Sequence, residues 1–479
     1  MMNPLRAAIV AALLLASSRA LAQTPSADRG AALSGPPELF TLDRAMQYAI
    51  DHYPAVRAAV EQVAASSAGV SVARSAYLPR LDALWQSNRA TANNIFGQVL
   101  PQSVIPSLTG PALTSTSSQS VWGSATGALF TWEPVDFGLR KAEVAGAEAA
   151  VTQARAGEAL TRLEVQSAVG VAFLNVVAAE RAVVAAQADV DRREALARTV
   201  HALVDNQLRP GADASRADAE RAAAQTRLIQ SQQVLAIAQS ALTRVLGAGG
   251  VVRADGEKLL ERVPPDAPKV AGVAAGGATA AAHPLAQARQ ASVDAALAQE
   301  QVLSRTDLPR LYLQSSVFAR GSGANANGTF DGGADGLGLE RANWAAGFQI
   351  VFPNVFDFSS LNARKAAAAA SARAETARRE EALLTITGER QAASAMVQAA
   401  RAIAANTPVQ VAAARQSVTQ ATARYQAGLA NIVEVADAQS LVAQSETQDQ
   451  IARVDVWRAL LAQAVADGAI EPFLKLIQP

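Results

Sequence analysis

The side chains best placed for chemistry are two carboxylates near the C-terminus, Glu434 and Asp437, which lie three residues apart. On a helix this spacing puts both on one face, which on its own is typical of solvated surface charges. The chain has three histidines and no cysteine, and it contains no HExxH, phosphate-loop or nucleophile-elbow motif. We therefore expect no enzyme activity, no catalytic or metal-ligating residues and no cofactor.

Composition and charge narrow the class of protein further. The charges of the 42 basic and 42 acidic residues cancel, and both kinds are spread along the chain. Nucleic-acid binding is therefore not expected, because it requires an excess of positive charge. Residues 1–22 have one early arginine, a short apolar core and small residues at Ala20 and Ala22, which is typical of a secretory signal peptide. The absence of cysteine predicts that the exported protein has no lipid anchor. Residues 23–41 are rich in Ser, Gly, Ala and Pro, and we expect a flexible segment there.

An internal repeat organises the rest of the chain. Pro54 lies 25 residues before the Leu-Pro-Arg-Leu motif at Pro79, and Pro284 lies 25 residues before the same motif at Pro309. Such a repeat predicts two similar structural halves. We expect repeat 1 over residues 42–249, a linker over 250–283, repeat 2 over 284–467 and a C-terminal tail over 468–479.

Each repeat contains two segments with the alternating pattern of β-strands, at about 80–90 and 120–132 and at about 310–320 and 343–353. The clearest one has large apolar residues on one face and small or polar residues on the other, which predicts a lipid-facing surface. Its lipid-facing residues are Trp344, Phe348, Ile350 and Phe352. Four strands cannot close a barrel around a lumen, so several chains must contribute strands. The Ser/Gly/Asn-rich connections, residues 90–119 and 321–340, are expected to be exposed loops.

Very long helices make up the remainder of each repeat. Residues 138–204 and 361–426 are Ala-rich and almost free of helix breakers, and a helix of that length spans on the order of 100 Å. Each ends near a glycine, at a turn near 210 (Pro210-Gly211) and a turn near 428 (Ala427-Gly428), followed by another helical segment. A glycine past a helix end readily takes the left-handed conformation that closes a helical hairpin. We therefore expect one helical hairpin per repeat.

These features resemble the TolC-like outer-membrane efflux protein family, the outer membrane factors. The resemblance rests on the order and spacing of five motifs: Leu42 to Pro54, Tyr77 to Leu81, Trp132 to Gly138, Arg424 to Gly428, and Ile432 to Ala438. It implies a mainly α fold with a membrane β-barrel. In such a homotrimer four strands per chain form a 12-stranded barrel, which a long periplasmic α-helical coiled-coil barrel continues.

The resemblance also implies a periplasmic gate. Glu434 and Asp437 match the family's carboxylate ring, and three copies would surround a narrow opening that attracts cations. Tyr425 matches a latch residue, and Asp218 is the nearest match for its partner. Ala430 stands where the family carries a basic latch residue.

The resulting hypothesis is a passive exit duct in the Gram-negative outer membrane that extends into the periplasm. A periplasmic adaptor would meet the hairpin tips at Pro210, Gly211, Ala427 and Gly428, and an inner-membrane pump of the RND, ABC or MFS type would supply energy. Efflux of drugs or solvents is the first hypothesis for the cargo, and type I protein secretion is the second. The alternative is a periplasmic coiled-coil scaffold without a channel, which would be extracted without detergent and would lack a heat-modifiable trimer.

Overall fold

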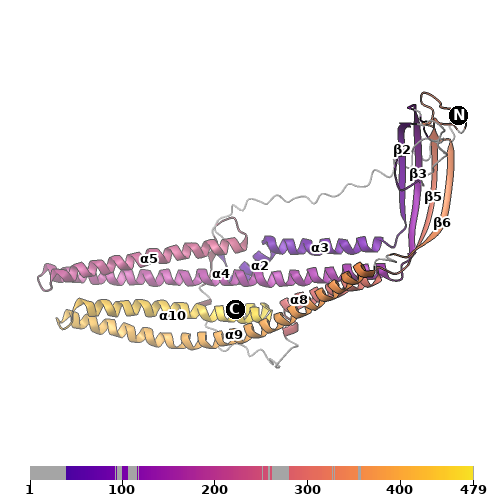
Figure 1. The fold of residues 1–479 in the computed structure, drawn as a ribbon. Helices are drawn as coiled ribbons and strands as arrows, with labels where there is room; N and C mark the ends of the chain where they lie inside the picture. Colours follow the sequence, from indigo (N-terminus) through magenta and orange to yellow (C-terminus); the bar gives the residue numbers. More distant parts are fainter. Residues whose placement is uncertain are drawn as a thin grey trace.

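The protein is an elongated molecule with a sheet at one end and two helical hairpins at the other (Figure 1). The computed structural model describes residues 39–91, 93, 100–105, 116, 118–250, 252–256, 259–260, 280–325, 327, 329–353 and 358–477. The expected signal peptide, the flexible segment up to residue 38 and most of the linker lie outside these residues. Within them, the mainly helical fold with two repeats is confirmed, since the same series of elements occurs twice.

The sheet has four antiparallel strands in the order β2-β3-β5-β6, so both repeats contribute a hairpin to it. The strands are β2 (Arg80–Thr91), β3 (Ser120–Val135), β5 (Arg310–Ser322) and β6 (Arg341–Val351). Each hairpin follows a short helix, α3 (Pro54–Ser75) or α8 (Pro284–Arg305), that begins at one of the repeated prolines. Proline suits that first helical position because it lacks the amide hydrogen that a helix leaves unbonded there.

Two long helical hairpins lead away from the sheet (Figure 1). The first joins α4 (Leu139–Asp205, 67 residues) to α5 (Gly211–Leu246). The second joins α9 (Phe358–Gln426, 69 residues) to α10 (Ile432–Asp467). Pro408 lies inside α9 without ending it. The length of α4 corresponds to about 100 Å at 1.5 Å per residue.

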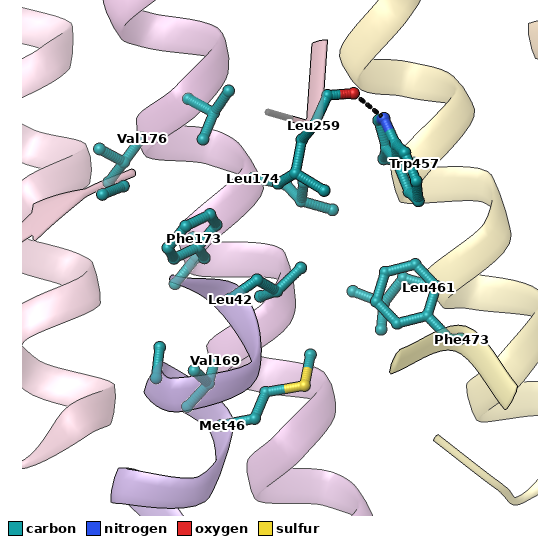
Figure 2. Packing of buried hydrophobic residues seen from close by; sticks show 14 of the residues in the cluster. Leu42, Met46, Val169, Phe173, Leu174, Val176, Leu259, Trp457, Leu461 and Phe473 are labelled. Atoms are coloured by element: carbon teal, nitrogen blue, oxygen red, sulfur yellow. Dashed lines mark hydrogen bonds between the residues drawn. The ribbon is translucent and has the colours of Figure 1, made fainter. Parts of the chain in front are cut away.

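A hydrophobic core at mid-length holds the two repeats together. Short helix α2 (Leu42–His52) packs there against α4, and α10 packs from the other side (Figure 2). The indole nitrogen of Trp457 donates a 2.6 Å hydrogen bond to the carbonyl oxygen of Leu259, and its ring meets Phe473 edge-on. One described helix, α4, is long and apolar enough to cross a membrane by length and composition, but half of its most apolar stretch is buried in the molecule.

Both ends of the chain also contribute to this core region. The end of the expected flexible segment forms β1 (Leu39–Phe40), which pairs in parallel with β4 (Arg253–Ala254) from the expected linker. The expected tail contains helix α11 (Glu471–Ile477), whose Phe473 is 2% exposed. Buried aromatic side chains, rather than local sequence pattern, order these segments.

The change from strand β3 to helix α4 is fixed by a buried ion pair. Asp136 accepts hydrogen bonds from the backbone amides of Gly138 (2.9 Å) and Arg140 (2.8 Å) and from the guanidinium of Arg140 (2.6 Å). Arg140 also donates to the carbonyl oxygen of Ala76 and lies over the Tyr77 ring. Burial raises the pKa of Asp136, but these hydrogen bonds outweigh it, so the pKa is below its usual value.

Candidate functional site

The two hairpin turns are built alike, and together they form the helical end of the molecule. In the first turn, the amides of Gln207 and Leu208 donate to the carbonyls of Val204 and Leu203. In the second, the amides of Gly428 and Leu429 donate to the carbonyls of Tyr425 and Arg424. These hydrogen bonds make Gln207 and Gly428 equivalent, and both have the left-handed backbone, with φ of 58° and 77°.

This geometry corrects the expected role of Gly211. The sequence favoured Gly211 as the turn glycine of the first hairpin, but it is the first residue of α5. Gln207 takes the left-handed position instead, where its amide and that of Leu208 donate to carbonyls of the last turn of α4. The other expected tip residues, Pro210, Ala427 and Gly428, lie at the turns beside it. Leu208 and Leu429 are the large apolar side chains presented by the two turns, with 68% and 72% of their surface exposed.

Tyr425 links the two hairpins. Its side chain is only 1% exposed, and its hydroxyl donates a 2.9 Å hydrogen bond to the carboxylate of Asp213 in the first turn of α5. Arg209 lies over the Tyr425 ring, 4.3 Å from its centroid, and donates a hydrogen bond to its carbonyl oxygen. Apolar side chains of both hairpins, including Val200 and Val435, surround the ring. We call Arg209, Asp213 and Tyr425 the tip latch.

The prediction that Asp218 is the partner of Tyr425 is wrong. Its carboxylate lies 3.0 Å from the ring of His201 and 3.5 Å from Arg221, so it belongs to a separate cluster. The error came from counting from Gly211; counted from Gln207, Asp213 occupies the position that Glu434 has in the second repeat. Counted in the same way, Arg209 is the first-repeat equivalent of Ala430.

Burial and the Asp213 carboxylate favour the neutral form of the Tyr425 phenol. Removal of the ring from water, the hydrogen bond to Asp213 and the charge of that carboxylate together raise the pKa of Tyr425 to about 12. The positive charge of Arg209 opposes this shift but is the smaller effect. At neutral pH the phenol is therefore a hydrogen-bond donor and the carboxylate is its acceptor.

Glu434 and Asp437 lie at the same end of the molecule but outside the tip latch. Neither is buried, whereas Ile432, Val435 and Ala436 on the other face of α10 are. The Glu434 amide is capped by the side chain of Asn431 at 3.0 Å, and its carboxylate lies 3.9 Å from Arg424. The carboxylates are thus directed away from the core of their own chain.

A second polar contact between the hairpins lies further from the turns. Arg193 of α4 is 2% exposed and donates to Asp189 on its own helix, to Glu220 of α5 (2.8 Å) and to Ser440 of α10 (3.0 Å). The adjacent Arg192 forms a 2.9 Å ion pair with Glu446 of α10. The cluster is not apparent in the sequence because its members come from three helices; the single available signal is a run of charges in an otherwise Ala-rich helix.

The register of the sheet shows which residues of neighbouring strands lie on the same face. Trp344 and Phe348 of β6 lie opposite Val317 and Leu313 of β5, so these four side chains share one face. Trp344 and Phe348 are 79% and 74% exposed, and the nearby Ile350 and Phe352 are also largely exposed. Across the sheet, Leu81, Trp85 and Phe130 continue this face. The opposite face carries mainly small and polar residues (Gln86, Gly127, Gln314, Ser316, Gly347 and Gln349), together with the apolar Leu84, Leu129 and Phe318.

None of the three histidines lies in the tip latch. His283 is buried, and its ring accepts a hydrogen bond from the Leu285 amide and contacts the carbonyl of Val465, so it caps α8. His52 stacks on Tyr48. Among the residues that the structure describes, no group of three or more His, Asp or Glu side chains is arranged to hold a metal ion.

Comparisons with known proteins agree with this architecture. The sequence model of the family described as "Outer membrane efflux protein" matches residues 45–248 and 277–468. No curated protein matches the sequence. Among solved structures, the outer membrane protein VceC from Vibrio cholerae has 17% identity and a TM-score of 0.70, covering 89% of this chain and 96% of its own.

Two further solved structures show the same fold. The CmeC outer membrane channel of Campylobacter jejuni has 13% identity and a TM-score of 0.70, with 89% of this chain and 85% of that chain covered. The open state of the MtrE outer membrane channel of Neisseria gonorrhoeae has 18% identity and a TM-score of 0.67, with coverage of 89% of each chain.

Proposed function

Because the chain belongs to the outer membrane efflux protein family, we propose that three copies form a duct through which small molecules leave the cell. The duct would lie in the Gram-negative outer membrane and extend into the periplasm. It would be passive, without enzymatic chemistry or a cofactor. Drugs and solvents are the cargo class we propose.

The sheet supports assembly in a membrane. One face is apolar and exposed, as shown by Trp344 and Phe348, while the other carries mainly small and polar residues. The edge strands β2 and β6 have no neighbour on their outer sides among the described strands. Unpaired strand edges are not tolerated in lipid, and four strands are too few for a barrel. Three copies would provide 12 strands and pair every edge.

The helices support a periplasmic extension and partners. A helix of about 100 Å is far longer than the roughly 30 Å hydrocarbon core of a membrane, so most of it must lie outside the membrane. The exposed Leu208 and Leu429 at the turns offer apolar contacts to a periplasmic adaptor. An inner-membrane pump of the RND, ABC or MFS type would then drive cargo into the duct.

The tip latch is the observation that carries this proposal. Tyr425, Asp213 and Arg209 hold the second hairpin against the first in a single chain. In the trimer, release of these contacts would let the second hairpin move outward and widen the periplasmic opening. Glu434 and Asp437 would line that opening and attract cations, since closely spaced carboxylates in a narrow pore concentrate counter-ions.

The test is single-channel recording of the detergent-purified trimer in planar lipid bilayers. We expect a small, stable, cation-selective conductance whose selectivity falls in the Glu434→Gln/Asp437→Asn variant. The matched control is Asp191→Asn/Glu194→Gln, an exposed carboxylate pair with the same spacing on α4. We expect this control to leave selectivity unchanged. A folded protein that extracts without detergent and never inserts would contradict the channel and favour the periplasmic scaffold.

A further inference from the structure

Part of the connection between β2 and β3 that the structure describes lies against the sheet. This part is residues 100–105, and we call them the inner segment. Val104 and Ile105 are 8% and 3% exposed and pack on Ala125 of β3 and Phe318 of β5. The sequence predicted an exposed loop over residues 90–119 that builds no core, and for the inner segment that prediction is wrong.

The inner segment covers the polar face of the sheet. Phe318 lies opposite Gly127, and Gly127 lies opposite Leu84, so these positions share a face. That face is opposite the exposed apolar one marked by Trp85 and Trp344. If the apolar face contacts lipid, as in the proposed function, the inner segment lies inside the barrel.

The inner segment is held by specific interactions. The side-chain oxygen of Gln102 accepts hydrogen bonds from the amides of Val104 (2.5 Å) and Ile105 (2.8 Å), and its nitrogen donates to the carbonyl of Ile105 (2.8 Å). A Cβ at position 127 would lie 2.7 Å from the Cβ of Phe318, so glycine there leaves room for the Phe318 side chain. The Gln102 side chain thus holds the backbone of the inner segment, and the Phe318 side chain on which the segment packs has its room from Gly127.

The inner segment reaches well into the sheet. Ala125 lies five residues from the end of β3 at Ser120, which is about 17 Å along a strand. Beside the segment is an open cavity of about 430 Å³. Its lining includes Ser103, Leu129, Gln314, Ser316 and Gln349. The exposed edge of the segment, on the side away from the sheet, is formed by Leu100, with 56% of its surface exposed, and Ser103.

We propose that residues 100–105 form an internal constriction of the duct that selects cargo. This inference rests on the proposed function, because it requires the polar face to line a lumen. Three inner segments would narrow the lumen at the same height. Their exposed edges, together with Gln314 and Gln349, favour small molecules that have both an apolar surface and hydrogen-bonding groups. The constriction is separate from the gate at the hairpin tips, which lies at the other end of the molecule.

The absence of cysteine makes a direct test possible. Ser103→Cys is examined by single-channel recording in the Tyr425→Phe/Arg209→Gln background, so that the tips do not limit the current. A bulky charged methanethiosulfonate reagent is added to the outer side. We expect up to three stepwise falls in conductance, one per subunit. The matched control is Thr329→Cys, an exposed residue in the β5–β6 connection, where labelling should leave conductance unchanged.

A second variant releases the inner segment rather than blocking the pore. Val104→Asn/Ile105→Asn removes its apolar contact with Phe318 and should raise conductance about 1.5-fold or more in the same background, because a constriction dominates pore resistance. Unchanged conductance in this variant would overturn the inference. The inference would also be overturned if the thiol at position 103 is labelled without a change in conductance, or if it cannot be labelled from either side of the membrane. If the parent protein forms no pore, the proposed function itself fails, which is a different result.

Discussion

The phenol hydroxyl of Tyr425, at the end of α9, donates a 2.9 Å hydrogen bond to the carboxylate of Asp213, at the start of α5. The two residues are 212 positions apart and belong to different repeats. Arg209 contacts the same tyrosine through its ring and its carbonyl oxygen. An outward movement of the second hairpin would break these contacts. In the proposed channel, conductance would therefore report how strongly they hold.

The first prediction concerns pH. The pKa of Tyr425 is raised to about 12 by burial and by Asp213. The folded protein therefore keeps this proton at pH values where the unfolded chain, with an ordinary tyrosine pKa of about 10, has lost it. The contribution to stability is complete below about pH 10 and is lost as the pH rises towards 12. We expect channel conductance to rise over that interval.

The control for pH is Tyr425→Phe, which cannot ionise at this position. Its conductance should be high already at neutral pH and should show no further rise between pH 10 and 12. Tyr48→Phe, in α2 at mid-length, should behave as the wild type. A rise in alkaline solution that is equally large in Tyr425→Phe would show that another group controls the transition.

The second prediction concerns Arg193. Its replacement by Met removes the buried cation from Asp189 and Glu220, and leaves Asp189 with the half-exposed Arg227 at 3.1 Å. Breaking a buried ion pair costs about 3–5 kcal/mol, so the unfolding temperature measured by circular dichroism should fall clearly. The comparison is Arg198→Met on the same helix, where the side chain is 68% exposed and pairs with Glu194. Exposed pairs contribute at most about 1 kcal/mol, and equal losses in the two variants would contradict the burial argument.

The third prediction compares the equivalent turn residues. Gln207 has a left-handed backbone, which disfavours a side chain by about 1 kcal/mol relative to glycine. Gln207→Gly should therefore raise the unfolding temperature, and Gly428→Gln should lower it by a similar amount. Thermal unfolding of the two single variants tests this. If both substitutions shift the temperature in the same direction, side-chain contacts rather than backbone strain dominate at these turns.

The fourth prediction concerns the junction of β3 and α4. Asp136→Asn leaves the guanidinium of Arg140, which is 5% exposed, without its carboxylate. Because the pKa of Asp136 is lowered in the folded state, its contribution to stability is present above the ordinary aspartate pKa and is lost as the pH falls through the lowered one. The unfolding temperatures of wild type and variant should differ at pH 7 and converge in acid. A difference that is independent of pH would mean that shape, not charge, matters at this junction.

Much of the fold could be predicted because its signals are local and occur twice. The prolines at 54 and 284 begin equivalent helices, and uninterrupted Ala-rich segments allow helices of 67 and 69 residues. The apolar face of β6 is visible in the alternation of Trp344, Phe348 and Ile350 with small or polar residues. The face of β5 could not be chosen from its own residues; it follows only from the pairing of Leu313 with Phe348.

The turn geometry, the latch partner and the inner segment could not be predicted, because they depend on contacts between residues far apart in the sequence. The sequence pointed to Gly211 as the turn residue because glycine favours a left-handed backbone, but Gln207 adopts that conformation. Counting from the wrong turn residue then led to Asp218, whereas Tyr425 bonds to Asp213. The inner segment was missed because its composition is that of a loop. Its burial depends on Phe318, which lies in the other repeat.

The central claim is that the tip latch holds a channel closed. It is tested most directly by single-channel conductance of Tyr425→Phe/Arg209→Gln, which removes the hydrogen bond to Asp213 and the cation over the ring but keeps the apolar packing. We expect a stable pore with a conductance several times that of the wild type. A pore with wild-type conductance, formed by a trimer of unchanged thermal stability, would contradict it.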